Sequence, residues 1–152
     1  MSAVAFSPDG TLLATADGDG TVRLWDPVTR RLVGAPIQAT SAQNGVSAVA
    51  FSPDGTLLAT ADGDGTVRLW DPVTRRLVAA PIQADAQNGV SAVAFSPDGT
   101  LLASAGVDGV VRLWQVSLFT HPYAALCAYA GPPTPQEWNQ YASGEPQPKV
   151  CG

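Results

Sequence analysis

Residues 47–78 read SAVAFSPDGTLLATADGDGTVRLWDPVTRRLV, and residues 2–33 are the same 32-residue string. A third copy runs from Ser91 to Trp114. It differs at four positions, where Ser104, Gly106, Val107 and Val110 replace Thr60, Asp62, Gly63 and Thr66. The copies recur at spacings of 45 and 44 residues, and a fixed period of this length is typical of repeat proteins. The chain therefore contains three copies of one structural unit, followed by a different sequence over residues 117–152.

Each copy contains three short apolar runs separated by turn sequences. In the second copy the runs are Val46–Phe51, Thr56–Ala61 and Thr66–Trp70. They are joined by Ser-Pro-Asp-Gly and Asp-Gly-Asp-Gly, and Pro, Asp and Gly all favour tight turns. Runs of this length, joined this closely, predict an antiparallel meander. Because the runs are apolar or small at nearly every position, we expect both faces of each sheet to be covered.

A fourth run follows in the first two copies, over residues 31–38 and 76–83. Each contains a proline, Pro36 or Pro81, which has no N–H to donate and therefore belongs to an edge strand. We predict an all-β fold in which each copy is a four-stranded antiparallel sheet with its last strand outermost. The expected units span about residues 1–39, 46–84 and 90–116.

The composition excludes several classes of function. Hydrophobic residues make up 45% of the chain and charged residues 14%, which is enough apolar material for a core and too little charge for a disordered chain. The net charge of -5 gives no broad attraction to nucleic acid or anionic lipid. No run approaches the roughly 18 apolar residues of a membrane span, and the first residues lack the cationic segment of a signal peptide. We expect a cytoplasmic protein that binds neither nucleic acid nor membranes.

These repeats resemble the WD40 family of β-propeller proteins. The dipeptides Trp25-Asp26 and Trp70-Asp71 close the third run, Phe-Ser-Pro-Asp-Gly follows the first, and Asp-Gly-Thr-Val-Arg-Leu-Trp spans the third. The spacing also falls within that family's period. The resemblance covers residues 1–116 and implies a β-propeller segment of three four-stranded blades. Residues 117–152 form a separate tail, for which we predict a short helical cap.

The resemblance also implies a structural hydrogen-bonded tetrad of aspartate, serine or threonine, tryptophan and histidine in each blade. The histidine is missing, because Ala42 and Ala86 stand at the corresponding positions. The matching residues are Thr15, Asp19 and Trp25 in the first copy, Thr60, Asp64 and Trp70 in the second, and Ser104, Asp108 and Trp114 in the third. The indole of Trp70 then needs another acceptor, since a buried donor left unpaired costs about 1–3 kcal/mol.

Paired aspartates in each Asp-Gly-Asp-Gly turn could bind a hard cation such as calcium. The loop lacks the further ligands of such a site, and Gly106 replaces the first aspartate in the third copy. We therefore interpret these aspartates as turn residues and predict no metal or cofactor. The arginines two residues before each tryptophan are interpreted as stems packed between blades with their heads on carboxylates or in water, rather than as a row that binds an acidic partner. They are Arg23, Arg68 and Arg112.

The sequence offers little for catalysis. His121 is the only histidine and lies outside the repeats, so a Ser-His-Asp or Cys-His arrangement could form only around that residue. Cys127 and Cys151 lack the spacing of a zinc site. Whether these two cysteines form a disulfide or stay free thiols is open at this point. We predict that the protein is not an enzyme.

The sequence predicts a non-catalytic scaffold for protein–protein interaction. The polar loops ahead of each first strand are the best candidates for contact with a protein partner, namely Gln43, Asn44, Ser47, Gln87, Asn88 and Ser91. Three blades leave two apolar sheet faces without a neighbour, because propeller rings usually need about four to eight. The chain is then either a fragment of a larger propeller or a protomer that completes its ring with copies of itself.

Two alternatives remain. One is a self-assembling structural module that has no other partner. The other is a metal-dependent propeller hydrolase or lyase that uses the aspartate pairs Asp17/Asp19 and Asp62/Asp64.

Overall fold

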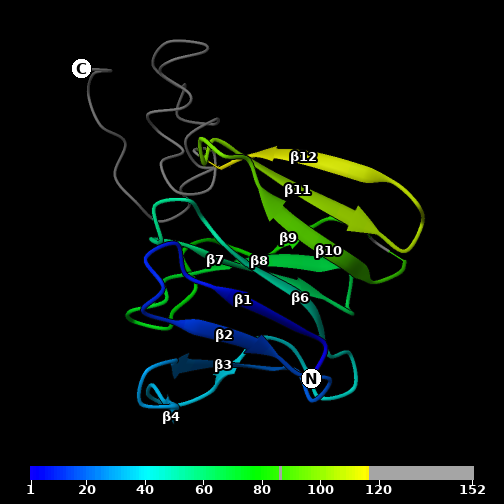
Figure 1. The fold of residues 1–152 in the computed structure, drawn as a ribbon. Coiled ribbons are helices and arrows are strands. Elements are labelled where there is room, and N and C mark those ends of the chain that lie inside the picture. The colour runs from blue at the N-terminus through cyan, green and yellow to red at the C-terminus, as the bar shows by residue number, and fades with distance from the viewer. Residues whose placement is uncertain (86, 117–152) are drawn as a thin grey trace, which may run out of the picture. The chain divides into compact units, whose positions relative to one another are not determined.

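The computed structural model describes residues 1–85 and 87–116, and these are all-β, with three antiparallel sheets and no helix (Figure 1). The first sheet contains β1 (Ala3–Phe6), β2 (Leu13–Ala16), β3 (Thr21–Asp26), β4 (Arg31–Leu32) and β5 (Ile37–Gln38). The second contains β6 (Val46–Phe51), β7 (Leu58–Asp62), β8 (Thr66–Trp70) and β9 (Ile82–Gln83). The third contains β10 (Val90–Phe95), β11 (Leu101–Gly106) and β12 (Val111–Gln115). The predicted all-β fold, with one antiparallel meander for each sequence copy, is confirmed.

The Ser-Pro-Asp-Gly turns are held by one aspartate each. Asp54 accepts hydrogen bonds from the hydroxyl of Ser52 at 2.6 Å and from the backbone N–H and hydroxyl of Thr56 at 3.1 and 2.8 Å. Asp9 and Asp98 make the same set of bonds in the other two copies. Because Thr56 belongs to this turn, β7 begins two residues later than the sequence predicts, and it extends one residue further to include Asp62.

In the first two sheets the fourth strand is shorter than the sequence predicts. In the first sheet both β4 and β5 pair with β3, and Pro36 lies between them. In the second sheet a single bridge joins Trp70 to Leu77, and β9 pairs with β8 only after Pro81. In the third sheet the described residues form three strands, and the chain after residue 116 lies outside them. The three antiparallel sheets, with five, four and three described strands, agree with the predicted blades. Proline interrupts the ladder because it removes a backbone donor.

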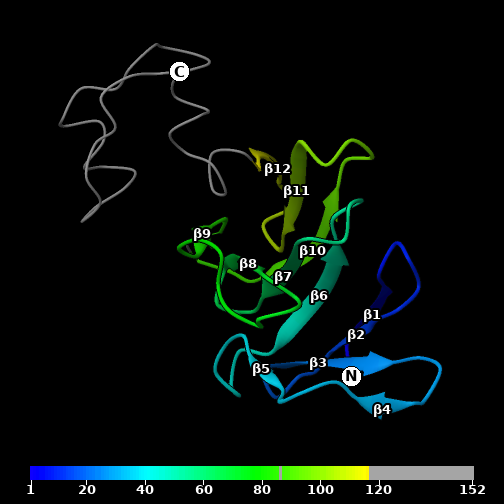
Figure 2. The same cartoon turned by 90° about the vertical axis from the view of Figure 1, so that its left-hand side faces the viewer.

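The sheets stack through their first strands. Strand β6 lies beside β1 on one side and β10 on the other, in both views of the fold (Figure 2). The core between the first two sheets includes Val22, Leu24, Val46, Val49 and Leu58. All five residues of the central strand β7 are buried, which agrees with the expectation of a sheet covered on both faces. The part of the chain that the structure describes holds no helix with the length and hydropathy of a membrane span.

Candidate protein-interaction site

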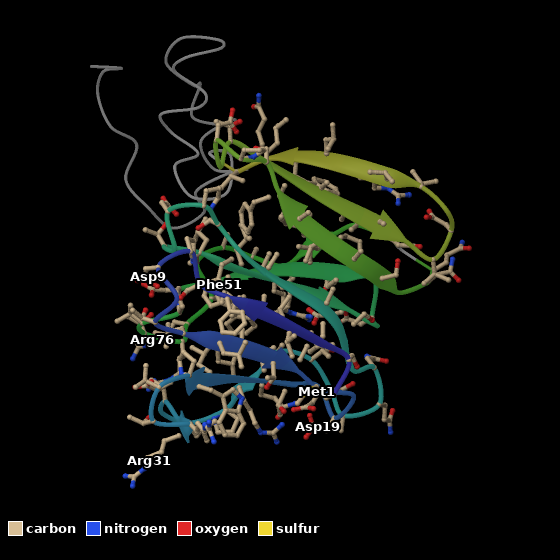
Figure 3. All side chains as sticks on the ribbon, viewed as in Figure 1. Met1, Asp9, Asp19, Arg31, Phe51 and Arg76 are labelled. Carbon is tan, nitrogen blue, oxygen red and sulfur yellow. The ribbon has the colours of Figure 1, made fainter. Side chains whose placement is uncertain are left out.

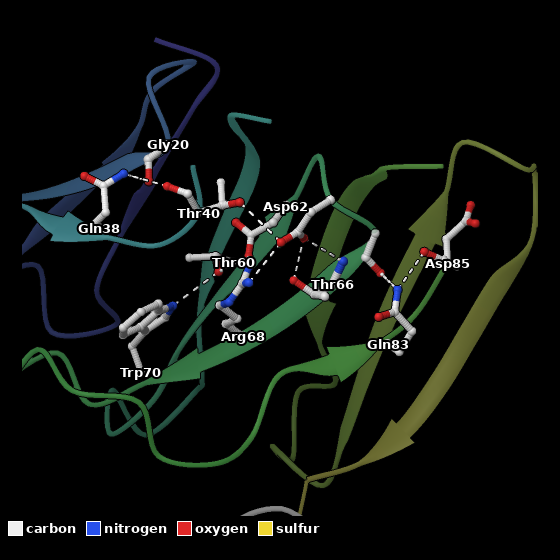
Figure 4. Close-up of polar contacts among 12 residues, drawn as sticks. Gly20, Gln38, Thr40, Thr60, Asp62, Thr66, Arg68, Trp70, Gln83 and Asp85 are labelled. Atoms are coloured by element: carbon white, nitrogen blue, oxygen red, sulfur yellow. Dashed lines mark hydrogen bonds and ion pairs between the residues drawn. The ribbon is translucent and has the colours of Figure 1, made fainter. Parts of the chain in front are cut away.

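A chain of polar contacts crosses the buried middle of the second sheet (Figure 4). The indole N–H of Trp70 donates to the hydroxyl of Thr60 at 3.2 Å, and that hydroxyl lies 3.2 Å from a carboxylate oxygen of Asp62, to which it donates. The guanidinium of Arg68, directly opposite Thr60 on β8, also donates to Asp62. The hydroxyl of Thr60, one of the residues expected in the tetrad, is therefore the acceptor for the indole.

The same tryptophan contact recurs in the other two sheets. Trp25 donates to Thr15 at 3.0 Å, and Trp114 donates to Ser104 at 2.9 Å. The turn aspartates of the expected tetrad do not contact the threonine or serine that accepts from the indole. Asp64 accepts hydrogen bonds from the N–H and hydroxyl of Thr66 and from Arg68, rather than from Thr60. Asp19 and Asp108 likewise bind their own turns and arginines.

Asp62 joins this network, although the sequence interpretation treated it as a turn residue. Its position could have been found from strand alternation, because residues two apart on a strand share a face and Thr60 is two residues before it. Asp62 is 0% exposed, and burial raises its pKa to about 6 despite the hydrogen bond from Arg68. For Asp64, desolvation also acts to raise the pKa, but hydrogen bonds from Arg68 and Thr66 hold it below the usual value.

Arginine, rather than an open cavity, faces each pair of aspartates. Arg68 binds Asp62 at 2.5 Å and Asp64 at 2.9 Å, and Arg23 binds both Asp17 and Asp19 in the first sheet. The N-terminal amine of Met1 also lies 3.1 Å from Asp17. Within residues 1–85 and 87–116, no group of three or more potential ligands could hold a metal ion. The positive charges beside these carboxylate pairs are therefore the arginines, whose heads were expected on carboxylates or in water.

Two edges of the sheets carry the loops (Figure 3). Met1 and Asp19 lie at one edge, which also carries the linkers between sheets, and Asp9 and Arg76 lie at the other. At the linker edge, Gln43, Asn44, Gln87, Asn88 and Ser91 are exposed and Ser47 is half-buried. The structure thus brings the candidate partner residues to one edge, where the linkers sit against the Asp-Gly turns of neighbouring sheets. The N–H of Gly63 donates to the carbonyl of Gly45 at 3.0 Å.

The opposite edge holds a shallow groove of about 470 Å³. The Ser-Pro-Asp-Gly turns of the first two sheets line it, together with Pro72 and Val73. Its charged groups are Asp9 and Asp54. Both carboxylates are already used by turn hydrogen bonds, which lower the pKa of each below its usual value. The groove therefore has no polar group left over that points to a particular ligand.

The third candidate surface consists of the two sheet faces at the ends of the stack, which we call the end faces. On β12, Val111 and Leu113 are each 66% exposed, whereas their counterparts Val67 and Leu69 on β8 are 0% and 1% exposed. On β1, Val4 is 57% exposed, whereas its counterpart Val49 on β6 is 7% exposed. The same residues are thus buried wherever a neighbouring sheet covers them.

Several predicted features lie outside the described residues. These are the helical cap over residues 117–152, the single histidine His121, and the cysteines Cys127 and Cys151. The structure describes nothing that tests them.

A comparison with protein families finds one family whose pattern matches most of the repeat region. The family described as WD domain, G-beta repeat (WD40) matches residues 1–26, 34–71 and 81–115. The first matched segment spans β1 to β3, and the second and third each begin with the last strand of the preceding sheet, β5 or β9, and end with the third strand of the next sheet. The comparison with curated proteins gives no match. Sequence motifs, three antiparallel meanders and the family match agree, and the chain therefore belongs to the WD40 repeat family.

Proposed function

We propose that this protein is a non-catalytic scaffold for protein–protein interaction and that each end face receives a further WD40 blade. WD40 repeats generally serve as such scaffolds. In a sample of the purified chain, the blade at each end comes from a second copy. The remaining blades of a larger propeller would occupy the same faces in the same way.

The observation that carries this proposal is the difference in burial between identical residues. Val67 and Leu69 are buried because the third sheet covers them, whereas Val111 and Leu113 have the same neighbours along their strand but no sheet over them. Burying an aliphatic side chain of this size contributes about 1.5–3 kcal/mol. A covering blade is therefore strongly favoured.

The end face at β1 supplies the complementary surface. Residues 2–33 and 47–78 are identical, so β1 presents the same side chains as residues 48–51 of β6, which include the core residue Val49. The core residue Val46 has Met1 as its counterpart. A second copy can dock its first sheet on β12 as the second sheet docks on the first. This contact is heterologous, because two different faces meet, and such contacts form rings when the rotation closes.

Sedimentation velocity of the full chain over a range of concentrations tests the proposal. We expect concentration-dependent assembly, and we expect Leu113→Glu to abolish it. Val73→Glu is the matched control, because Val73 is 80% exposed but lies at the groove rather than on an end face. A wild-type chain that stays monomeric at every concentration contradicts the proposal, as does equal assembly of the Leu113→Glu variant.

We further propose that the linker edge contacts a protein partner through Gln43, Asn44, Ser47, Gln87, Asn88 and Ser91. This proposal is supported by the position of these residues at one edge of the sheets, where all but the half-buried Ser47 are exposed. Replacing Gln43, Asn44, Gln87 and Asn88 by alanine should leave self-assembly unchanged, because none of them lies on an end face. Loss of assembly in that variant would assign the edge to the contact between copies instead.

A further inference from the structure

One sequence difference between the second and third copies is accompanied by a second difference in the linker that precedes the third copy. In the third copy Gly106 stands where the second has Asp62. In the linker, Asp85 stands where the previous linker has Thr40. The backbones of these two linker residues are placed alike, because the N–H of Thr40 donates to Gly20 at 3.1 Å and that of Asp85 donates to Gly65 at 2.9 Å. One carboxylate has thus been lost from the sheet and another gained in the linker.

At the boundary between the first and second sheets, the buried carboxylate comes from the sheet. Arg68 is held by Asp62 and Asp64, both on its own sheet. The linker contributes only the neutral hydroxyl of Thr40, 3.3 Å from a carboxylate oxygen of Asp64. The boundary therefore contains one fully buried carboxylate.

At the next boundary, the third sheet lacks that group. Arg112 binds Asp108 through one nitrogen at 2.9 Å, and its other terminal nitrogen, Nη1, is buried without a hydrogen-bond partner among the described residues. Asp85 is 5% exposed, and its Oδ2 is likewise buried without such a partner. The other oxygen, Oδ1, accepts the N–H groups of Gln87 and Asn88, both at 3.0 Å.

The free oxygen of Asp85 faces the place that Asp62 fills in the second sheet. A Cβ atom built on Gly106 would lie 2.5 Å from Oδ1 of Asp108 and 3.1 Å from Oδ2 of Asp85. Asp85 also acts on the arginine. The hydrogen bond that Arg112 donates to Asp108 raises the pKa of Arg112 most, and the charges of Asp108 and Asp85 raise it further.

We propose that Asp85 supplies, from the linker and across the blade boundary, the second carboxylate for Arg112, in place of the one that Asp62 supplies to Arg68 within its own blade. Asp85 and Gly106 are then a compensating pair that specifies which linker fits which blade. A blade with aspartate at this position requires a neutral linker residue, and a blade with glycine requires an acidic one. With both an aspartate at position 106 and Asp85 present, two buried carboxylates would repel each other away from water. With neither, the buried Nη1 of Arg112, whose side chain is 33% exposed, would have no carboxylate beside it. This inference does not depend on the proposed scaffold function.

A double-mutant cycle on the full chain tests the proposal. The variants are Asp85→Asn, Gly106→Asp and the double variant, compared with wild type by urea unfolding at fixed protein concentration. Asparagine keeps the acceptor for the N–H groups of Gln87 and Asn88 while removing the charge. We expect each single variant to lower the equilibrium constant for folding by about tenfold or more. The double variant should return to within about threefold of wild type, because it recreates the arrangement of the second blade.

Two controls make the cycle specific. Gly106→Ala adds the bulk of a Cβ atom without the charge, so Asp85→Asn should not rescue it. Thr40→Asp combined with Asp62→Gly reverses the exchange at the other boundary, and this pair should also be more stable than the sum of its single variants predicts. Additive effects at the boundary around Gly106 would overturn the proposal. If both single variants fail to fold, a folded double variant supports the pair and an unfolded one refutes it.

Discussion

Replacing Asp62 by asparagine should change how the stability of the protein depends on pH. Asp62 is 0% exposed, and burial raises its pKa from 3.8 to about 6. The folded protein therefore holds a proton on this group more tightly than the unfolded chain does. Because the folded state binds more protons, the contribution of Asp62 to stability is greatest below pH 3.8 and is lost as the pH rises through 6.

The size of the effect follows from the difference of about 2 pKa units between the two states. At about 1.4 kcal/mol per unit, the full contribution of this group is about 3 kcal/mol, of which about 2 kcal/mol is lost from the free energy of unfolding between pH 4 and pH 7. Asparagine does not titrate, so the difference in stability between the Asp62→Asn variant and wild type should shift by that amount in favour of the variant. The measurement is urea unfolding followed by tryptophan fluorescence at half-unit steps of pH.

Asp64→Asn is the matched control, because Asp64 binds the same arginine but has a lowered pKa. A lowered pKa contributes stability above the unfolded value and loses it as the pH falls further, so this variant should differ from wild type in its pH dependence only below about pH 4. The reasoning is refuted if wild type and Asp62→Asn give parallel stability curves between pH 4 and pH 7.

Three further predictions concern packing and ions. Leu69→Ala should lower the free energy of unfolding by about 2–5 kcal/mol because Leu69 is 1% exposed. Leu113→Ala in the monomer should lower it far less, and equal losses in urea unfolding would contradict the difference in burial. Gly63→Ala should destabilise the fold because the added Cβ atom would lie 1.9 Å from the carbonyl oxygen of Asn44. Gly18, its counterpart in the first copy, has nothing within 4 Å of such an atom and should tolerate alanine. A thermal melt in which Gly18→Ala is the less stable variant would contradict this close approach. Calorimetric titration with calcium should give no binding heat, because Arg23 and Arg68 already bind the paired aspartates; heat that disappears in Asp62→Asn would instead support the metal-dependent alternative.

Much of the fold could be predicted because the same pattern of apolar runs and turn sequences occurs in three copies. The turn residues placed the strand ends to within about two residues, a normal margin for element boundaries. The apolar run around Leu58 correctly indicated a strand covered on both faces. The fourth strand was harder, because a proline with a short strand on either side and a proline inside one edge strand give the same sequence pattern.

The polar network was predicted less completely. The sequence did not identify the group that accepts the hydrogen bond from the indole of Trp70, which in the structure is the hydroxyl of Thr60. Asp62 was interpreted as a turn residue because it begins an Asp-Gly-Asp-Gly sequence, yet it ends a strand and faces inward. The role of Asp85 could not be predicted, because its counterpart across the boundary is a glycine and only their spatial proximity relates the two.

The identity of residues 2–33 and 47–78 has a consequence for how such an array changes in length. An in-frame genetic crossover between the two stretches would delete or add 45 residues, and the product would contain only boundaries that this molecule already has. Such a crossover would leave Asp85 directly ahead of the unit that contains Gly106. The array can therefore shrink or grow by whole units at its repetitive end without separating Asp85 from Gly106, the two residues that we propose to be matched.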